Sequence, residues 1–295
     1  MSSIGNLITR AALAPLLATG RLSLANARRS TRWLARPLHA AMRRRAGIVR
    51  RNLELCFPGL DAPTRRELEG KHFRHLAEMI GETAFTWRQP GRLGPEVGEV
   101  VGLEHIERAR ADGRGLLLLT AHVTGLELGA RLFGEQVRAR AIYRPLANPV
   151  LERIQNEGRA RYAEAMIGHR NLRAMAGHLR AGGVLWFAPD QDPGPQRACF
   201  APFFGVSTAI GTGPLSLARM GRARVLPMLP IKDPASGRIK VILEPVWEDF
   251  PSSDPVADLR RYHDFLERHL AADPSQYWWL HRRFKTAPEG EPPRY

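Results

Sequence analysis

The stretch GLLLLTAHVTGLELGAR, residues 115–131, joins an apolar run to a histidine and then to a glutamate. The uninterrupted run Leu116–Leu119 has the length and composition of a strand buried on both faces, which is typical of a parallel sheet. From Leu126 to Phe133, apolar residues recur at the i, i+4, i+7 spacing of an amphipathic helix. The stretch therefore predicts a strand, a turn that carries His122, and a helix that begins near Glu127.

The same alternation of apolar runs with helical patterns continues on both sides. Further strands are predicted at 138–144, 183–189, 223–230 and 238–246, and helices at about 43–56, 63–87, 102–112, 148–166, 171–181, 213–221 and 255–274. Residues 190–208 are predicted to form a loop. Strands that alternate with helices predict an α/β fold with a mixed, mostly parallel sheet flanked by helices.

Length and cysteine content restrict the class of protein. A chain of 295 residues with 44% hydrophobic residues is long enough for one sizeable core. Its two cysteines, Cys56 and Cys199, lie far apart and form no CxxC motif. This usage favours a reducing compartment over a secreted disulfide scaffold.

The positive charge is concentrated at the N-terminus. The formal charge is +15, and residues 1–53 hold 11 arginines with no acidic residue before Glu54. At about 100° per residue, leucines gather on one side of a helix, and the opposite side collects Arg10, Arg21, Arg28, Arg32, Arg36, Arg43 and Arg50. Because Pro15, Gly20 and Pro37 interrupt the segment, we expect two or three amphipathic pieces. We predict a basic amphipathic arm over residues 1–52 and a separate body over residues 53–295.

The arm is expected to lie on a membrane rather than cross it. No window of the arm reaches the roughly 20 apolar residues that a spanning helix needs, and a basic face opposite a leucine face is typical of helices that bind anionic headgroups. A nucleic-acid-binding arm, an organelle transit peptide and a solvated helix face are the alternatives. The leucine face disfavours the first and the low serine content the second.

Three predicted strands end on polar residues, at Ala121-His122, Tyr143-Arg144 and Pro189-Asp190. The carboxyl ends of parallel strands meet at one edge of a sheet, where ligands bind in this class of fold. We therefore expect a pocket at this edge that contains an imidazole, a guanidinium and carboxylates.

His122 is the candidate general base of this pocket, because an unperturbed imidazole with a pKa of about 6.5 is largely neutral near pH 7. The chain reverses after the strand, so we expect the Glu127 carboxylate to reach the imidazole and fix its tautomer. The sequence has no GxSxG motif and no well-placed cysteine nucleophile, which favours acyl transfer to a hydroxyl of the substrate. The alternative is a structural histidine beside a glutamate that interacts with the helix dipole.

A metal site formed by His122, Asp190 and Asp192 is a weaker alternative, since HExxH and other clustered ligand patterns are absent from the sequence. We expect no metal. Asp190 and Asp192 also stand next to Pro193-Gly194, so a role as turn formers is open for both.

Several motifs in order carry a family resemblance. They are AHVTGLELGAR (121–131), YRPLANP (143–149), GRARY (158–162), PDQDPGP (189–195), FAPFFG (200–205) and YWWLHRRFKTAPEGEPPRY (277–295). Together they resemble the late acyltransferases of lipid A biosynthesis, the lauroyl/myristoyl acyltransferase family of Gram-negative bacteria. The likeness extends from about RRNLELCFP (50–58) to the last residue. The HxxxxE spacing alone belongs to a wider clan of lysophospholipid-type acyltransferases, whereas the ordered set is specific.

The resemblance implies an acyltransferase-like fold and a reaction. A fatty acyl chain, lauroyl-like by expectation, passes from acyl carrier protein to the hydroxyl of a 3-hydroxyacyl chain on a lipid A precursor. This implies a location at the cytoplasmic face of the bacterial inner membrane, with an anionic membrane surface as a further partner, no nucleic acid and no cofactor.

By the same resemblance, His122 takes the role of catalytic base and Glu127 that of its charged partner. Arg159 falls where the family carries an arginine linked to activity, and Asp190 and Asp192 fall in its acidic loop after a strand. We expect Arg144, Arg159, Asp190 and Asp192 to bind substrate. Arg144 and Arg159 are also suited by their chemistry to bind a carboxylate or a phosphate, such as Glu127, a sugar phosphate or phosphopantetheine.

Two alternative functions stay open at this point. One is acylation of another glycolipid or of a lysophospholipid by the same histidine and glutamate. The other is a non-catalytic basic protein that binds nucleic acid or membrane through its arm. Neither the length of the acyl chain nor the acyl position that is modified follows from the sequence.

Overall fold

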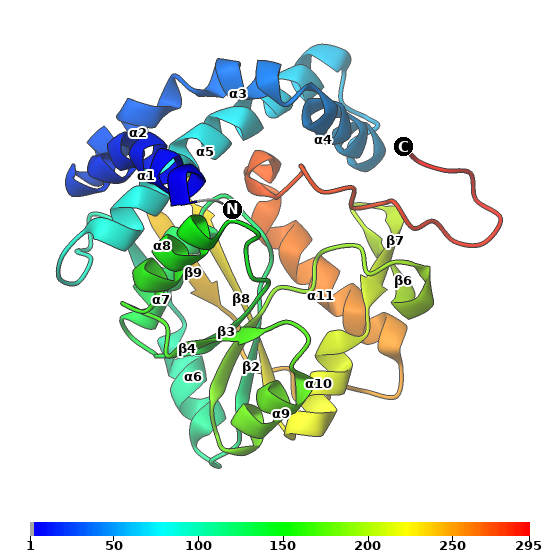
Figure 1. The fold of residues 1–295 in the computed structure, drawn as a ribbon. Helices are drawn as coiled ribbons and strands as arrows, with labels where there is room; N and C mark the ends of the chain where they lie inside the picture. Colours follow the sequence, from blue (N-terminus) through cyan, green and yellow to red (C-terminus); the bar gives the residue numbers. More distant parts are fainter. Residues whose placement is uncertain (1–2) are drawn as a thin grey trace.

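The computed structural model describes residues 3–295 (Figure 1). Residues 1–2 of the predicted arm and the side chain of Arg10 lie outside the described residues. The central sheet has the strand order β1-β9-β8-β2-β5-β3-β4. Its strands are β1 (Gly98–Val101), β2 (Leu116–Leu119), β3 (Arg140–Tyr143), β4 (Ala165–Gly168), β5 (Val184–Phe187), β8 (Arg224–Lys232) and β9 (Ile239–Leu243). Within this described sheet, the β8–β9 pair is antiparallel and the other pairs are parallel, which confirms the prediction of a mixed, mostly parallel sheet.

Helices pack on both faces of this sheet and continue into the N-terminal segment (Figure 1). The α-helices are α1 (Ser3–Ala18), α2 (Leu24–Arg32), α3 (Ala35–Ala41), α4 (Arg43–Cys56), α5 (Ala62–Arg88), α6 (Leu103–Arg110), α7 (Leu126–Gly134), α8 (Pro149–Arg159), α9 (Leu172–Arg180), α10 (Gly213–Gly221) and α11 (Pro255–Leu270). Short 3-10 helices are η1 (Thr19–Arg21), η2 (Pro195–Arg197) and η3 (Pro274–Gln276).

Two sequence predictions of secondary structure are wrong. The helix predicted to reach residue 166 ends at Arg159, and β4 follows because its residues pair with β3 at the edge of the sheet. The predicted loop 190–208 contains strand β6 (Ala198–Phe203), which forms a hairpin with β7 (Val206–Gly211). Phe204 and Gly205 have φ values of 46° and 77°, as a two-residue hairpin turn requires. Tertiary pairing overrides local propensity in both places.

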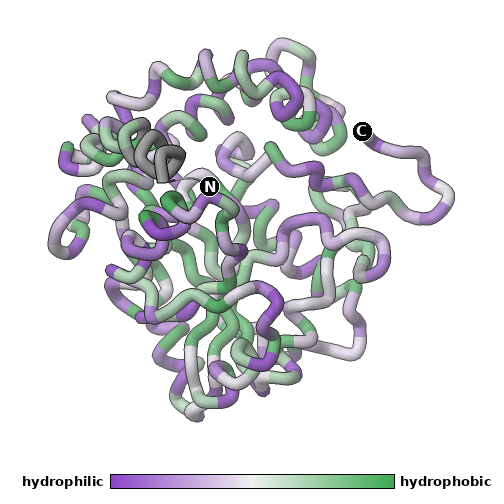
Figure 2. Tube along the Cα trace, in the orientation of Figure 1, coloured by the Kyte–Doolittle hydropathy of each residue, from purple (hydrophilic) through white to green (hydrophobic). Residues whose placement is uncertain are grey.

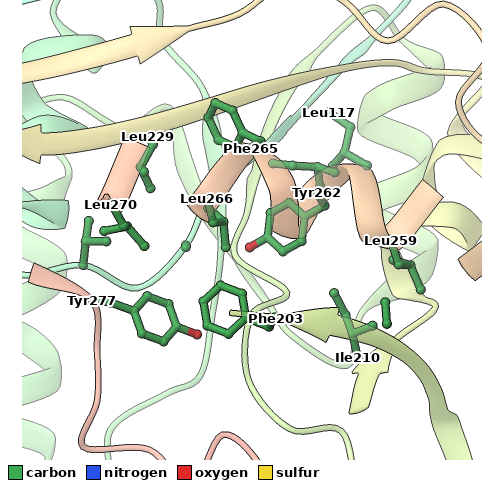
Figure 3. Packing of buried hydrophobic residues seen from close by; sticks show 14 of the residues in the cluster. Leu117, Phe203, Ile210, Leu229, Leu259, Tyr262, Phe265, Leu266, Leu270 and Tyr277 are labelled. Atoms are coloured by element: carbon green, nitrogen blue, oxygen red, sulfur yellow. The ribbon is translucent and has the colours of Figure 1, made fainter. Parts of the chain in front are cut away.

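The strands form the most apolar part of the chain (Figure 2). All four leucines of β2 are 0% exposed, because Leu117 and Leu119 pack in one hydrophobic cluster and Leu116 and Leu118 in another. Figure 3 shows α11 in the core, with Tyr262 and Phe265 close to Leu117 and with Phe203 of the hairpin nearby. The Tyr262 hydroxyl donates a hydrogen bond of 2.6 Å to the Thr120 carbonyl at the end of β2. The core thus fixes the position at which β2 ends.

The N-terminal segment packs on the body of the protein. Helices α2, α3 and α4 form an arch over α5 (Figure 1). Residues 3–56 contain four α-helices where two or three helical pieces were expected, and the first break is at Gly20 as predicted. Pro15 lies inside α1 and Pro37 inside α3, so neither proline ends a helix. Helix α4 continues through residues 52 and 53, where the boundary between arm and body was predicted.

One arginine of the predicted basic face is turned into the protein. Arg28 donates to the buried Glu82 carboxylate at 2.6 Å and to the Gly237 carbonyl at 2.8 Å, and its side chain is 16% exposed. The expectation that Arg28 belongs to an exposed basic face is therefore wrong, because Arg28 is the ion-pair partner of buried Glu82 on α5. Among residues 3–295, no helix combines the length and the apolar character that crossing a membrane requires.

Replacing Gly81 with alanine is expected to lower the free energy of unfolding by about 1–3 kcal/mol, as overpacking does in a close contact. A Cβ at Gly81 of α5 would lie 2.1 Å from the Ala27 carbonyl oxygen of α2. The matched control is Gly177→Ala in α9, where a Cβ meets no atom within 4 Å. This control should raise the free energy of unfolding by about 0.5–1 kcal/mol through helix propensity. Equal stabilities in urea denaturation would contradict the close packing of α2 on α5.

Candidate active site

The three polar strand ends meet as predicted. Strands β2, β5 and β3 are neighbours, and both pairs are parallel. His122, Asp190 and Arg144 follow the carboxyl ends of these strands, so they reach the same edge of the sheet. The sheet topology confirms the prediction of a polar site at this edge.

His122 and Asp190 form the closest polar pair of the site. The His122 Nδ1 atom lies 2.6 Å from Asp190 Oδ1, and the His122 backbone N–H donates to Asp190 Oδ2 at 3.0 Å. The Asp190 side chain is 2% exposed, whereas the His122 side chain is 34% exposed. A carboxylate that accepts from Nδ1–H leaves Nε2 as the basic nitrogen. Asp190 therefore fixes the orientation of the imidazole on its buried side, and the rest of the imidazole remains accessible.

The prediction that Glu127 is the carboxylate partner of His122 is wrong. Glu127 was expected to reach His122, but its hydrogen bonds come from Trp87, Arg159 and Tyr162. Asp190 takes the expected position because β5 is hydrogen-bonded to β2, so that the residues after the two strands come together. A sequence separation of 68 residues hides this pairing from local reasoning.

Burial and Asp190 shift the pKa of His122 in opposite directions. Burial lowers the pKa of the imidazole, but the charge and the hydrogen bond of Asp190 outweigh it and raise the pKa above its usual value. Burial likewise raises the pKa of Asp190, and the charge and hydrogen bonds of His122 outweigh this effect, so the carboxyl pKa is lowered. Asp190 is thus ionised at neutral pH and stabilises a protonated His122.

A C-terminal segment holds the backbone around His122. The Trp278 N–H donates to the His122 carbonyl at 3.0 Å, and the Thr124 N–H donates to the Gln276 carbonyl at 2.9 Å. The Tyr277 hydroxyl donates to the Asp190 carbonyl at 3.2 Å. These contacts fix the chain on both sides of the imidazole, and they come from a part of the sequence that the prediction of the site did not include.

Glu127 belongs to a second buried cluster. Arg159 binds its carboxylate through two hydrogen bonds, Nε to Oε1 at 2.9 Å and Nη2 to Oε2 at 2.6 Å. Trp87 Nε1 donates to Oε1 at 2.7 Å, and the Tyr162 hydroxyl donates to the same oxygen. The pairing of Arg159 with Glu127, one of the partners considered for it from the sequence, is confirmed.

Glu127 and Arg159 keep each other ionised. Burial raises the pKa of Glu127, but the Arg159 charge and the hydrogen bonds of its three partners outweigh burial and hold the pKa below its usual value. Burial lowers the pKa of Arg159, and the Glu127 charge outweighs it, so the guanidinium pKa is raised. The cluster is a rigid ion pair at neutral pH.

A cavity of about 300 Å³ opens beside both clusters. His122, Glu127, Arg144 and Arg159 line its polar part. Its other walls are mainly apolar and include Leu126, Ala130, Phe133, Ala139, Ala141, Ile142, Met166, Trp186 and Ala188. An apolar cavity with a few convergent polar groups is the usual form of a small-molecule site.

The remaining predicted site residues differ in their positions. Arg144 is exposed and lines the cavity. Asp192 does not line it: its Oδ1 accepts from the Gly194 N–H and the Thr286 hydroxyl, and its Oδ2 accepts from the Thr286 N–H at 2.7 Å. Asp192 thus forms a turn and ties its loop to the C-terminal segment, which agrees with the turn-forming alternative.

The structure gives no support to the metal alternative. Within residues 3–295, no group of three or more histidine, cysteine, aspartate or glutamate side chains has the arrangement of a metal site. Asp192 points to Thr286 while Asp190 points to His122, so the three residues considered from the sequence do not converge.

Glu127→Ala is expected to lower the free energy of unfolding by about 3 kcal/mol, because it leaves the Arg159 guanidinium buried without a counter-charge. The comparison is Glu157→Ala in α8, whose ion pair with Arg153 at 2.6 Å is exposed to solvent. That variant should unfold at nearly the same urea concentration as the unsubstituted protein. Similar shifts in the two variants would contradict a structural role of the Glu127–Arg159 pair.

Sequence reasoning missed Trp87 and Tyr162 as members of the site. Tyr162 ends the motif GRARY and lies in the turn after α8, where its backbone N–H donates to the Arg159 carbonyl at 3.1 Å. Trp87 is near the end of α5, 40 residues before its partner, and no local pattern indicates their contact.

Comparisons with known proteins agree with the motifs. Residues 6–286 match the family model described as bacterial lipid A biosynthesis acyltransferase. The chain is 40% identical over 255 residues to the lipid A biosynthesis lauroyltransferase of Escherichia coli strain K12, covering 86% of this chain and 83% of that protein. It is 36% identical over 263 residues to the lipid A biosynthesis palmitoleoyltransferase of the same organism, covering 89% and 85%.

Among solved structures, the 1-acyl-sn-glycerophosphate acyltransferase PlsC from Thermotoga maritima covers 78% of this chain and 97% of its own, at 15% identity and a TM-score of 0.38. This similarity is too slight to bear on function. The family model and the curated relatives each cover most of the chain. The chain therefore belongs to the bacterial lipid A biosynthesis acyltransferase family.

Proposed function

We propose that the protein transfers a fatty acyl chain from acyl carrier protein to the hydroxyl of a 3-hydroxyacyl chain on a lipid A precursor. The observation that carries this proposal is the His122–Asp190 pair at an apolar cavity. The pair supplies a base for a hydroxyl, and the cavity supplies a surface for an acyl chain. The relatives named as lipid A lauroyl- and palmitoleoyltransferases support the choice of acceptor.

The reaction needs one proton transfer in each direction. His122 Nε2 takes the proton of the acceptor hydroxyl while that oxygen attacks the thioester carbonyl carbon. The tetrahedral intermediate then collapses, the C–S bond breaks, and the imidazolium returns the proton to the departing thiolate of the carrier. Asp190 stabilises the imidazolium between these steps. N–H groups in the first turn of α7 are our candidates for binding the oxyanion.

We assign Glu127 and Arg159 to the wall of the acceptor site. Their ion pair is rigid and lines the cavity beside His122. A guanidinium with one edge bound to a carboxylate keeps its remaining donors for substrate oxygens. Arg144 lies at the exposed part of the cavity and is suited to a phosphate of the carrier's phosphopantetheine or of the acceptor sugar.

We place the protein at the cytoplasmic face of the bacterial inner membrane. Support comes from the basic N-terminal segment and from exposed Leu22 and Trp33 within it. Helices that combine arginines with exposed aromatic and aliphatic side chains bind at anionic lipid surfaces. An interfacial position would present the cavity to a lipid acceptor and to a soluble, acidic carrier protein.

The test is a panel of acceptors incubated with acyl carrier protein thioesters and followed by mass spectrometry. A tetra-acylated lipid A precursor should gain the mass of one acyl group, and a lauroyl thioester should react faster than shorter or longer donors. Gain of mass on a lysophospholipid or another glycolipid, with none on the lipid A precursor, would show that the acceptor is wrong.

A further inference from the structure

A second large cavity lies on the outer side of the helical arch. It has a volume of about 710 Å³ and shares no lining residue with the catalytic cavity. Its lining residues come from α2, α3, α4, α5 and the α2–α3 junction, and they are Arg32, Trp33, Ala35, Arg36, His39, Arg50, Arg66, Glu69, Gly70, Phe73 and Arg74. We name this cavity the arginine groove.

The arginine groove carries an uncompensated positive charge. Five arginines and one glutamate line it, which leaves a formal excess of four positive charges with histidine neutral. Glu69 is already bound, by His39 at 2.8 Å and by Arg50 at 3.2 Å. In the described part of the chain, Arg36, Arg66 and Arg74 form no ion pair.

Comparison with an adjoining cavity shows that the excess of unpaired positive charge is specific to the groove. That cavity shares Arg32 and Arg74 with the groove, but acidic residues also line it. There, Lys71 pairs with Asp273 at 3.1 Å, and Lys232 pairs with Glu78 at 2.9 Å. Because those cations have partners within the protein, an anionic ligand gains little in that cavity. In the groove, Arg32 pairs with Glu78 at 3.3 Å and Arg50 pairs with Glu69, whereas Arg36, Arg66 and Arg74 form no ion pair among the described residues. An anion in the groove therefore gains the charge of these three arginines.

The floor and rim of the groove suit an amphiphilic ligand. Phe73 is buried beneath it, with the His39 ring edge-on at 4.7 Å between ring centroids. Trp33 at the rim is 69% exposed, and its Nε1–H donates to the Ser30 carbonyl at 2.8 Å, so its polar atom is satisfied within its own helix. An exposed indole with a satisfied N–H is suited to the boundary between headgroups and acyl chains.

The groove faces away from the sheet. At about 100° per residue, Arg66, Gly70 and Arg74 lie on the side of α5 opposite His72. His72 is buried against η3, where its Nδ1 bonds to the Ser275 carbonyl at 2.8 Å. The groove is therefore on the outer face of the arch, where a ligand reaches it without entering the catalytic cavity.

We propose that the arginine groove binds the phosphate headgroup of a membrane lipid and so seats the helical arch on the bilayer. Guanidinium groups bind phosphate oxygens through paired hydrogen bonds, and the exposed Trp33 indole would lie beside the acyl chains. The inference rests on the proposed membrane location of the enzyme. It goes beyond general attraction of a basic arm to lipid, because it predicts one site with a defined lining.

The test measures binding to phosphatidylcholine vesicles that contain phosphatidic acid. The groove variant combines Arg36→Gln, Arg66→Gln and Arg74→Gln. The control variant combines Arg108→Gln, Arg110→Gln and Arg173→Gln, which removes the same charge from exposed arginines on α6 and α9. A basic side chain at an anionic membrane is worth about fivefold in affinity, so the groove variant should bind at least about tenfold more weakly. The control variant should stay within about twofold of the parent.

A second variant leaves the charge unchanged. Gly70→Leu fills the floor of the groove, where a Cβ meets only the Arg74 guanidinium at 3.9 Å, so the fold should tolerate it. Its control is Gly47→Leu in α4, where a Cβ meets no atom within 4 Å. We expect Gly70→Leu to weaken vesicle binding by at least about fivefold and Gly47→Leu to leave it unchanged, with both melting near the parent temperature.

The proposal would be overturned if the groove and control variants lost vesicle affinity equally, or if the parent bound equally well to vesicles of the same charge that carry oleate instead of phosphatidic acid. It would also be overturned if inorganic phosphate or glycerol 3-phosphate bound the groove as tightly as the vesicles do, or if a DNA oligonucleotide bound more tightly than the vesicles in a groove-dependent way. The acyl transfer assay distinguishes failure of the groove proposal from failure of the proposed function. Groove-dependent vesicle binding without acylation of lipid A precursor would refute the function alone, and acylation with groove-independent binding would refute the groove alone.

Discussion

His122→Ala lowers the rate of acyl transfer to a lipid A precursor by on the order of 10³–10⁴-fold, if the imidazole is the general base. The expected size follows from the loss of both proton transfers, from the acceptor hydroxyl and to the departing thiolate. Single-turnover kinetics with a saturating thioester donor measure this step without product release. The KM for the acceptor should change little, because the imidazole acts on the reacting hydroxyl and the cavity walls stay in place.

His169→Ala is the matched control for this result. His169 is exposed after β4 and lies outside the residues that line the catalytic cavity. Its variant should retain the parent rate. A His122→Ala protein that melts normally and keeps a rate within tenfold of the parent would show that another group takes the proton.

Asp190→Asn is expected to lower the rate by on the order of 10²–10⁴-fold, the second-largest effect. The asparagine amide cannot supply the charge that stabilises a protonated His122, and it can hold the imidazole in the wrong tautomer. The loss should appear in the rate at saturating substrate rather than in binding, because Asp190 is buried behind the imidazole and does not line the cavity.

Asp192→Asn is the comparison for this variant. Asp192 stands in the same loop, but its carboxylate accepts hydrogen bonds from Thr286 and Gly194. We expect a loss of thermal stability with a rate near that of the parent. A loss of rate in Asp192→Asn as large as in Asp190→Asn would support the substrate-binding role that the sequence suggested for Asp192.

The layer architecture and the edge that carries the site follow from short-range patterns. The run Leu116–Leu119 indicated a strand buried on both faces, and its alternate leucines do pack in two separate hydrophobic clusters. The polar exits at His122, Arg144 and Asp190 converge because their strands are parallel neighbours. A rule about the carboxyl ends of strands was therefore enough to predict where the site lies.

The partners within the site did not follow from spacing. Five residues separate His122 from Glu127, and 68 separate it from Asp190, yet Asp190 makes the hydrogen bond. The order of strands in the sheet decides which loops meet, and local periodicity carries no information on that order. The same limit explains why Trp87 and the segment around Tyr277 were missed.

The N-terminal arm shows a different limit. Its charge and leucine pattern indicated an amphipathic segment, but the pattern did not show that α2 packs against α5. Gly81 permits this close approach, and Arg28 becomes the counter-charge of buried Glu82. A helix that is basic on one side can thus use part of that side for packing within the protein, and the rest is available to a membrane.

The central claim is that His122 acts as a base whose proton affinity Asp190 sets, and the pH dependence of single-turnover acyl transfer tests it most directly. Because Asp190 raises the imidazole pKa above 6.5, the parent rate should rise with pH through a midpoint above 6.5 as His122 loses its proton. In Asp190→Asn the midpoint should fall below that of the parent, and it should fall further than in Glu127→Gln, where the Arg159 charge that lowers the imidazole pKa loses its counter-charge. A parent and an Asp190→Asn variant with the same midpoint would contradict the claim.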